Sequence, residues 1–208
     1  MVDSFSFSSP IVWIGILIII IGLLGWIRWK LWRRRRFDLA KVTLRDIDKM
    51  DGHEFEDYLY VLISALDYDH VYQTKKSRDY GADLVFEDQE GIRTVVQAKR
   101  YRDKMGLSAV QEVYTAKTYY SADRALIITT AERISEPCMK LASATGVQIV
   151  DRLDLEDVIK AFKKGHFEEA WELLEEPPEP VKYTPMDSLE KPPARRGMIQ
   201  AGEYFYKN

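Results

Sequence analysis

The stretch from Gly81 to Lys99 constrains the fold of this chain more than any other. Two apolar runs rich in β-branched residues, 81–86 and 92–99, flank a five-residue polar connection that ends in Gly91. This pattern predicts a β-hairpin with a longer loop. If the loop is symmetric about its middle residue, Asp83 lies opposite Val95 and Phe86 lies opposite Ile92. We therefore expect a β-sheet that includes this hairpin.

The same hairpin gathers polar side chains on one face. Side chains alternate between the faces of a strand, so Gln97 and Lys99 share the face of Asp83, and Gln97 is its diagonal neighbour at about 7–8 Å. A carboxylate with further oxygens suits Mg²⁺, which lowers the pKa of a bound water, and a nearby ammonium can orient that water. The alternative is a sheet with one polar face and an ordinary Asp83–Lys99 ion pair.

A family resemblance rests on these residues and on stretches around them. Asp83, followed after the hairpin by Gln97-Ala98-Lys99, resembles the core of the PD-(D/E)xK nucleases. More narrowly, it is similar to the Mrr-type restriction endonuclease domain, whose variant has Gln in place of the second acid. Further similar stretches occur in the family's order: Asp51–Asp57, Thr74–Asp83, Gln97–Tyr101, Ala125–Thr130 and Val147–Asp151. Five motifs in register are more specific than any one of them.

The resemblance covers residues 50–155 and implies a fold and a chemistry. The implied fold class is α/β, with a restriction-endonuclease-like mixed central sheet flanked by helices. The implied partner is DNA, and the implied cofactor is Mg²⁺, with Mn²⁺ able to substitute. Asp83, Gln97, the Ala98 carbonyl and Glu56 are the implied metal ligands, and Lys99 acts on the attacking water. Cutting two strands commonly needs two sites, which implies a homodimer.

Glu56 lies near the start of a predicted helix. Asp51 is placed to cap this helix, with Glu54 three residues later as in a capping box. Phe55, Leu59, Leu62 and Leu66 then recur at helical spacing and predict its buried face. The resemblance gives Glu56 a role in the metal site. The alternative is a solvated first-turn acid favoured by the helix dipole.

Charge is distributed unevenly along the 208 residues, whose net charge is −3. Residues 1–41 carry +5 and residues 177–208 carry +1, so residues 42–176 carry −9, which counts against strong unaided binding of DNA. A local basic rim flanks the hairpin and predicts phosphate contacts; the alternative is a solvated rim. The candidate DNA contacts are Lys75, Lys76, Arg78, Arg100, Arg102 and Gln111, the last from the following helix.

Residues 11–27 form an unbroken apolar run. Seventeen helical residues span about 25 Å, enough for a thin or locally adapted bilayer. Tryptophans lie near both ends, and Arg28, Lys30 and Arg33 to Arg36 follow directly. These features predict a single transmembrane helix in the inner or plasma membrane, with the N-terminus outside and the nuclease domain cytoplasmic. A cleaved signal peptide is the alternative, but its positive charges precede its apolar region.

The remaining chain completes an alternation of helices and strands, which predicts a mixed sheet covered on both faces. The run Ala125-Leu126-Ile127-Ile128 is apolar throughout and predicts a central strand. The single cysteine, Cys138, is interpreted as a core residue. The predicted parts are an extracytoplasmic segment 1–10, the membrane helix 11–27, a basic connector 28–49, the nuclease domain 50–155, C-terminal helices 156–176 and a disordered Pro-rich tail 177–208.

Together these features predict a membrane-anchored, Mg²⁺-dependent DNA endonuclease that acts in DNA restriction or defence. The alternative function is a catalytically inactive module of the same fold that tethers DNA or a protein at the inner membrane surface. The acidic domain and the replacement of the second acid by Gln97 favour this alternative. Metal-dependent product formation separates the two.

Overall fold

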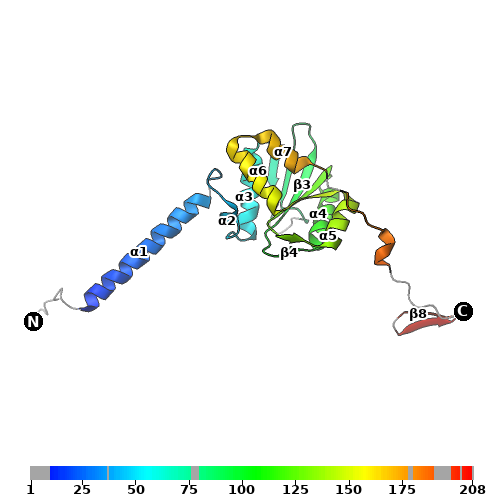
Figure 1. The fold of residues 1–208 in the computed structure, drawn as a ribbon, viewed down its shortest axis with the longest axis horizontal. Coiled ribbons are helices and arrows are strands. Elements are labelled where there is room, and N and C mark those ends of the chain that lie inside the picture. The colour runs from blue at the N-terminus through cyan, green and yellow to red at the C-terminus, as the bar shows by residue number, and fades with distance from the viewer. Residues whose placement is uncertain are drawn as a thin grey trace, which may run out of the picture. The chain divides into compact units, whose positions relative to one another are not determined.

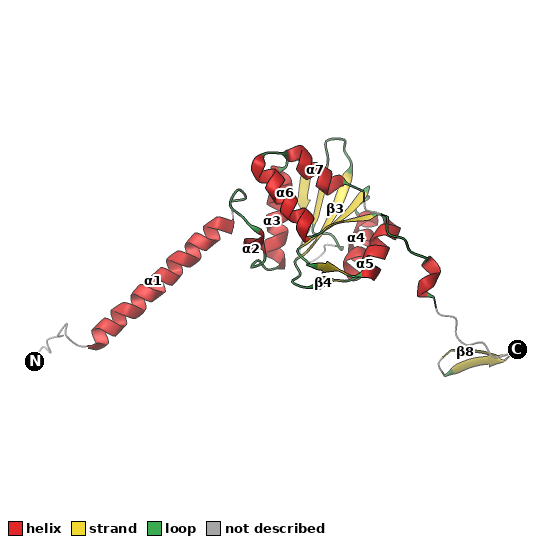
Figure 2. Cartoon of the chain, viewed as in Figure 1, coloured by secondary structure: helices red, strands yellow, loops and turns green. Residues whose placement is uncertain are grey.

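The hairpin expected from the sequence lies at the centre of a five-stranded sheet (Figures 1 and 2). The structure is a computed structural model that describes residues 10–36, 38–75, 80–177, 180–189, 198–201 and 203–207. Its strand order is β1-β2-β3-β5-β7. The bounds of these strands are β1 Asp69–Gln73, β2 Leu84–Glu87, β3 Arg93–Lys99, β5 Arg124–Thr129 and β7 Val147–Val150.

The sheet is mixed, as predicted. Strands β1, β2 and β3 pair antiparallel, whereas β3, β5 and β7 pair parallel. Strand β5 is hydrogen-bonded on both sides and buries residues on both faces, which explains its continuous apolar run. A separate parallel pair of two-residue strands, β4 (Lys104–Met105) and β6 (Arg133–Ile134), was not predicted.

Helices cover the two faces of the sheet, so there are two hydrophobic cores. The first core packs Leu84, Phe86 and Val96 against helices α2, α3, α6 and α7. The second packs Val85 and Val95 against α4 and α5, and it includes Cys138. The helix bounds are α2 Leu44–Ile47, α3 Gly52–Ala65, α4 Ser108–Tyr119, α5 Glu136–Thr145, α6 Arg152–Lys164 and α7 Phe167–Glu175.

Side-chain caps set where two of these helices begin. The Asp51 carboxylate accepts from the Glu54 backbone N–H at 2.8 Å, and the Glu54 carboxylate accepts from the Asp51 N–H at 2.9 Å. The predicted capping box of α3 is therefore present. Helix α6 begins at Arg152, before the predicted C-terminal helices at 156–176, because the Asp151 carboxylate caps it.

The first core extends beyond the predicted limits of 50 and 155. Val42 and Ile47 are fully buried in it, and Val158 and Leu174 from the C-terminal helices are also buried in it. The Arg152 guanidinium binds both carboxylate oxygens of Asp48, at 2.7 and 2.8 Å. The end of the predicted connector and the C-terminal helices therefore belong to the same folded body as the hairpin.

Helix α1 (Pro10–Arg36) contains the predicted apolar run. Its segment Trp13–Leu31 is long and apolar enough to cross a membrane by length and composition, and it buries none of its surface within the protein. Residues 179–208 form a second unit. Where the sequence predicts disorder, the described part of this unit contains a short helix, η1 (Pro185–Ser188), and a hairpin of β8 (Met198–Ala201) with β9 (Tyr204–Lys207).

Candidate functional site

The hairpin register places Asp83 closer to Gln97 than the sequence predicts. Val85 pairs with Val95, whereas the predicted partner of Val95 was Asp83. The prediction is wrong by two residues because the Asp88 carboxylate closes the loop by accepting from the backbone N–H groups of Glu90 and Ile92, both at 2.9 Å. A two-residue shift preserves side-chain alternation, so the predicted common face of the polar residues is retained.

Asp83 lies directly before β2, and backbone and side-chain donors hold its carboxylate. Its carboxylate accepts from the Ala98 backbone N–H at 2.7 Å and from the Gln97 side-chain amide. Its own N–H donates to the Val96 carbonyl at 2.8 Å. Asp83 is 8% exposed and Gln97 is 5% exposed, so this contact lies at the edge of the second core. Hydrogen bonds of this kind favour the charged form of a buried carboxylate.

The backbone of Ala98 is also directed toward this carboxylate. Along β3, the carbonyl of Val96 and the N–H of Ala98 both bond to Asp83, whereas the carbonyl of Lys99 faces β5 and accepts from Thr130. Because backbone groups alternate in direction along a strand, the Ala98 carbonyl points to the side of Asp83. A carboxylate, an amide and a carbonyl therefore meet where β2 begins.

Lys99 contacts a residue that the sequence reading missed. Its ammonium lies 2.6 Å from the Glu112 carboxylate, and the two side chains are 17% and 42% exposed. Helix α4 was expected to direct Gln111 at the site, but Gln111 is exposed and the neighbouring Glu112 reaches Lys99 instead. Glu112 is the one acid of α4 and lies three residues after the buried Ala109, a signal that could have identified it.

A close backbone contact fixes α4 beside the approach to Asp83. Gly81 has a φ of +88°, and a Cβ at this position would lie 2.4 Å from the Glu112 carbonyl oxygen. Only glycine combines this φ with so close an approach. The chain segment that leads to Asp83 is thereby packed against the residue that pairs with Lys99.

Glu56 lies in the first turns of α3, at the same end of the sheet. The carboxylate of Asp57, which follows Glu56, accepts from the Gln73 side-chain amide at 2.7 Å. Thr74, which follows Gln73, donates its N–H to the Asp83 carbonyl at 2.9 Å. The side-chain contact that the structure gives for Glu56 itself is with His53 Nδ1, at 3.1 Å. The structure therefore brings the helix end near Asp83 without joining the Glu56 carboxylate to it.

The predicted basic rim is only partly described. Lys75 and Arg102 are exposed, as a phosphate track requires. Arg100 instead turns inward, and its guanidinium donates to the Asp48 carbonyl. Lys76 and Arg78 lie outside the described residues.

The donor set suits a hard divalent cation. Among the described residues, no group of three or more His, Cys, Asp or Glu side chains is placed to hold a metal ion. Mg²⁺, however, commonly takes one or two carboxylates, completes its shell with water and accepts neutral oxygens. Asp83, the Gln97 amide and the Ala98 carbonyl offer such oxygens. The one cysteine, Cys138, is buried in the second core and is not part of this donor set.

Comparisons with solved structures give two weak likenesses. One is to EndoMS in its apo form, with a TM-score of 0.36, 12% identity and coverage of 49% of this chain and 45% of that chain. The other is to a repair endonuclease from Pyrococcus abyssi, with a TM-score of 0.35, 17% identity and coverage of 48% and 46%. The chain thus spans less than half the length of either protein. No curated protein matches the chain.

The family comparison is the stronger result. The model of the Mrr catalytic domain, described as a restriction endonuclease, matches residues 47–159. This range covers more than half of the 208 residues and contains the whole hairpin. It also begins within α2, three residues before the predicted domain limit. The chain therefore belongs to the restriction endonuclease family defined by the Mrr catalytic domain.

Proposed function

We propose that this chain is a membrane-anchored, Mg²⁺-dependent endonuclease that hydrolyses phosphodiester bonds in DNA. Family membership supports the nuclease activity. The observation that carries the mechanism is that the Ala98 N–H and the Gln97 amide both donate to the Asp83 carboxylate. Lys99 follows these two residues directly in the strand. This arrangement gathers metal-binding oxygens and a cation at the end of one strand.

Each residue has a distinct role in this proposal. Asp83, Gln97 and the Ala98 carbonyl would hold the cation, and Glu56 would supply a second carboxylate from the start of α3. A bound cation would supply a more acidic water and positive charge beside the phosphoryl group. The Lys99 ammonium orients the attacking water and stabilises negative charge in the transition state. An amide at position 97 in place of an acid makes metal binding weaker than at a two-carboxylate site.

Substitution of the site residues tests the mechanism. Asp83→Asn keeps the shape of the side chain but removes its charge, and Lys99→Ala removes the cation. We expect each change to lower the rate of plasmid cleavage in Mg²⁺ by about a hundredfold or more. EDTA abolishes cleavage by the unchanged protein. The exposed Lys160 of α6, which pairs with Glu156 and Asp157, provides the matched control variant Lys160→Ala.

The result also decides between catalysis and tethering. Cleavage at the original rate by Asp83→Asn or Lys99→Ala contradicts the mechanism. A folded protein that binds Mg²⁺ and DNA without forming product supports the inactive tethering module. The acidic charge of residues 42–176 is the observation that favours this second function.

The anchor forms a separate part of the proposal. Helix α1 carries an apolar segment, Trp13–Leu31, followed by four consecutive arginines, which supports a bilayer position with the nuclease domain in the cytoplasm. The membrane then confines cleavage to DNA that arrives at or passes the bilayer, as in restriction or defence. Carbonate extraction tests this: the protein stays in the membrane pellet, and deletion of residues 11–27 releases it. Release of the full chain contradicts the anchor. A homodimer stays a prediction.

A further inference from the structure

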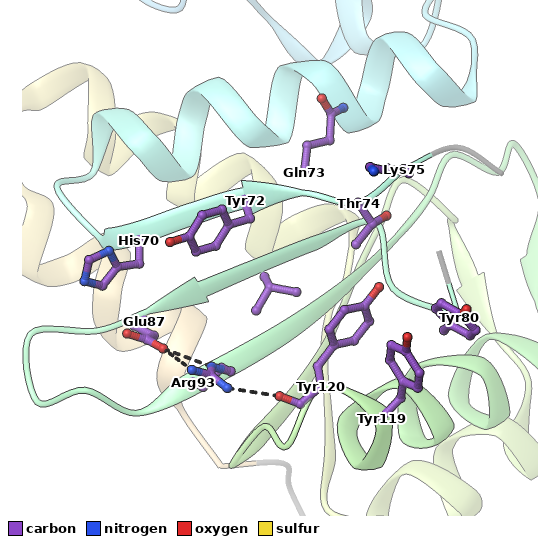
Figure 3. A pocket seen from close by; sticks show the side chains of 11 residues that line it. His70, Tyr72, Gln73, Thr74, Lys75, Tyr80, Glu87, Arg93, Tyr119 and Tyr120 are labelled. Atoms are coloured by element: carbon purple, nitrogen blue, oxygen red, sulfur yellow. Dashed lines mark hydrogen bonds and ion pairs between the residues drawn. The ribbon is translucent and has the colours of Figure 1, made fainter. Parts of the chain in front are cut away.

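A pocket of about 740 Å³ lies on the face of the sheet that carries Asp83 (Figure 3). Helix α4 packs over β3 and β5, and α5 packs over β7, and beside them Tyr72 of β1 is 60% exposed. Tyr72 of β1 and Glu87 of β2 form the floor of the pocket, and Tyr72 pairs with Val85 across the two strands. The volume is within the range of about 300–1,000 Å³ typical of small-ligand sites.

Three tyrosines from two segments line one side of this pocket. The rings of Tyr80 and Tyr119 stack at 3.9 Å with an angle of 20°, and Tyr120 meets Tyr119 edge-on at 4.9 Å. Tyr80 and Tyr119 are 47% and 56% exposed, so their rings remain open to a ligand. Tyr80 also has a φ of +50°, an uncommon conformation for a residue other than glycine that is often associated with functional sites.

Polar groups complete the pocket. The Arg93 guanidinium donates two hydrogen bonds to the Glu87 carboxylate, at 2.7 and 2.9 Å, and one to the Tyr120 carbonyl at 3.2 Å. These contacts link the polar floor to the aromatic side (Figure 3). Lys75 lines the pocket and is exposed. The pocket thus offers flat aromatic faces, fixed polar groups for the edge of a heterocycle and an ammonium for an adjacent phosphate.

Thr74 links the pocket to the backbone at Asp83. Thr74, which lines the pocket, donates its N–H to the Asp83 carbonyl and its hydroxyl to the Ala82 carbonyl. Val85 lies two residues after Asp83 on the same strand face, about 7 Å along the chain. A nucleotide whose phosphate lies at Asp83 can therefore place a neighbouring base beside the exposed Tyr72, which pairs with Val85.

We infer that this pocket binds an unstacked nucleobase of the DNA strand whose phosphate lies at Asp83, with the base stacked on an outer face of the Tyr80–Tyr119 pair. The inference rests on the proposed function for the position of the strand. Stacking on tyrosine accepts any base, because every base has a π-face. It offsets the cost of removing a base from the helix, a cost that is smallest in single-stranded or damaged DNA. The pocket therefore favours strands with unpaired bases next to the cleavage position.

Binding measured in EDTA tests base capture separately from cleavage. The full chain in detergent micelles is titrated into a fluorescein-labelled single-stranded oligonucleotide and into its duplex. Replacement of either stacked tyrosine, as Tyr80→Ala or Tyr119→Ala, is expected to weaken single-strand binding by about tenfold. Tyr80→Phe and Tyr119→Phe keep the ring and restore binding. Tyr114→Ala changes an exposed tyrosine of the same helix that does not line the pocket, and binding is unchanged.

Photo-crosslinking locates the captured base. An oligonucleotide with one 5-iodouracil is expected to crosslink to Tyr80 or Tyr119, and peptide mapping identifies the attachment site. Alanine variants that bind as tightly as the unchanged protein, or phenylalanine variants that lose as much as the alanine variants, overturn the inference. A protein that binds free dAMP but does not bind DNA also overturns the inference. A protein that captures the base but never cleaves supports this site while contradicting the proposed catalysis.

Discussion

At the scale of single residues, the informative contact is the ion pair of Lys99 with Glu112. The ammonium comes from β3 and the carboxylate from α4, 13 positions later in the chain. Glu112 does not contact the Asp83 cluster through any hydrogen bond that the described residues show, so its effect on the reaction passes through Lys99. We regard it as a positioning residue.

Glu112→Ala is expected to lower kcat for DNA cleavage by about tenfold and to leave KM nearly unchanged, because a freed lysine loses its orientation but the DNA contacts remain. The free energy of unfolding should change by less than about 1 kcal/mol, since the pair is partly exposed. Glu112→Gln keeps a hydrogen-bond acceptor and should recover part of kcat. Steady-state kinetics with Thr115→Ala as the control on the same helix checks this. A rise in kcat would show that Glu112 restrains the lysine instead.

At the scale of secondary-structure elements, the contact between the segment before β2 and helix α4 sets the geometry of the site. Gly81 brings the backbone of this segment against the Glu112 carbonyl, which holds α4 beside the hairpin that carries Asp83 and Lys99. A side chain at position 81 must push these elements apart.

Gly81→Ala is expected to destabilise the protein by about 2–5 kcal/mol, from a strained positive φ together with the overlap of its Cβ with the Glu112 carbonyl. Gly91→Ala is the matched control: its φ is +79°, but a Cβ there meets nothing within 4 Å. This control should cost only about 1 kcal/mol. Denaturant unfolding compares the two variants, and equal losses would show that the close contact contributes nothing.

At the scale of the whole molecule, Asp48 and Arg152 join two parts of the folded body that are far apart in the sequence. These residues are 104 positions apart, and their two hydrogen bonds connect the segment before α3 to the start of α6. The hydrogen bond from the Arg152 guanidinium holds the pKa of the Asp48 carboxyl below its usual value, with smaller contributions from the charges of Arg152, Arg100 and Arg102.

This pair makes stability depend on pH in a defined direction. Because the folded pKa of Asp48 is lowered, its contribution is present above the ordinary aspartate pKa and is lost as pH falls through the lowered value. Asp48→Asn should therefore cost about 0.5–1 kcal/mol at pH 7, after allowing for solvent screening, and nothing at a pH below the lowered pKa. Unfolding at both pH values checks this, with Asp103→Asn as the control from the highly exposed Asp103–Arg133 pair. An equal effect at both pH values would exclude a charge contribution.

The sequence by itself determined the main elements and the common face of Asp83, Gln97 and Lys99. Alternating apolar residues predict the hairpin, the Asp51–Glu54 pair predicts the start of α3, and residue spacing puts Asp83, Gln97 and Lys99 on one face. These features depend on contacts between neighbours in the chain or across one turn, so local patterns encode them.

The tertiary structure alone decided the register, the partner of Lys99 and the extent of the folded body. The register depends on the Asp88 side chain closing its own loop, and the partner of Lys99 depends on how closely Gly81 lets α4 approach. The tyrosine-lined pocket likewise exists because α4 packs over β3 and β5 and Tyr72 of β1 stays exposed. Such features join residues far apart in the sequence through packing, and packing distances have no periodic signature in the chain.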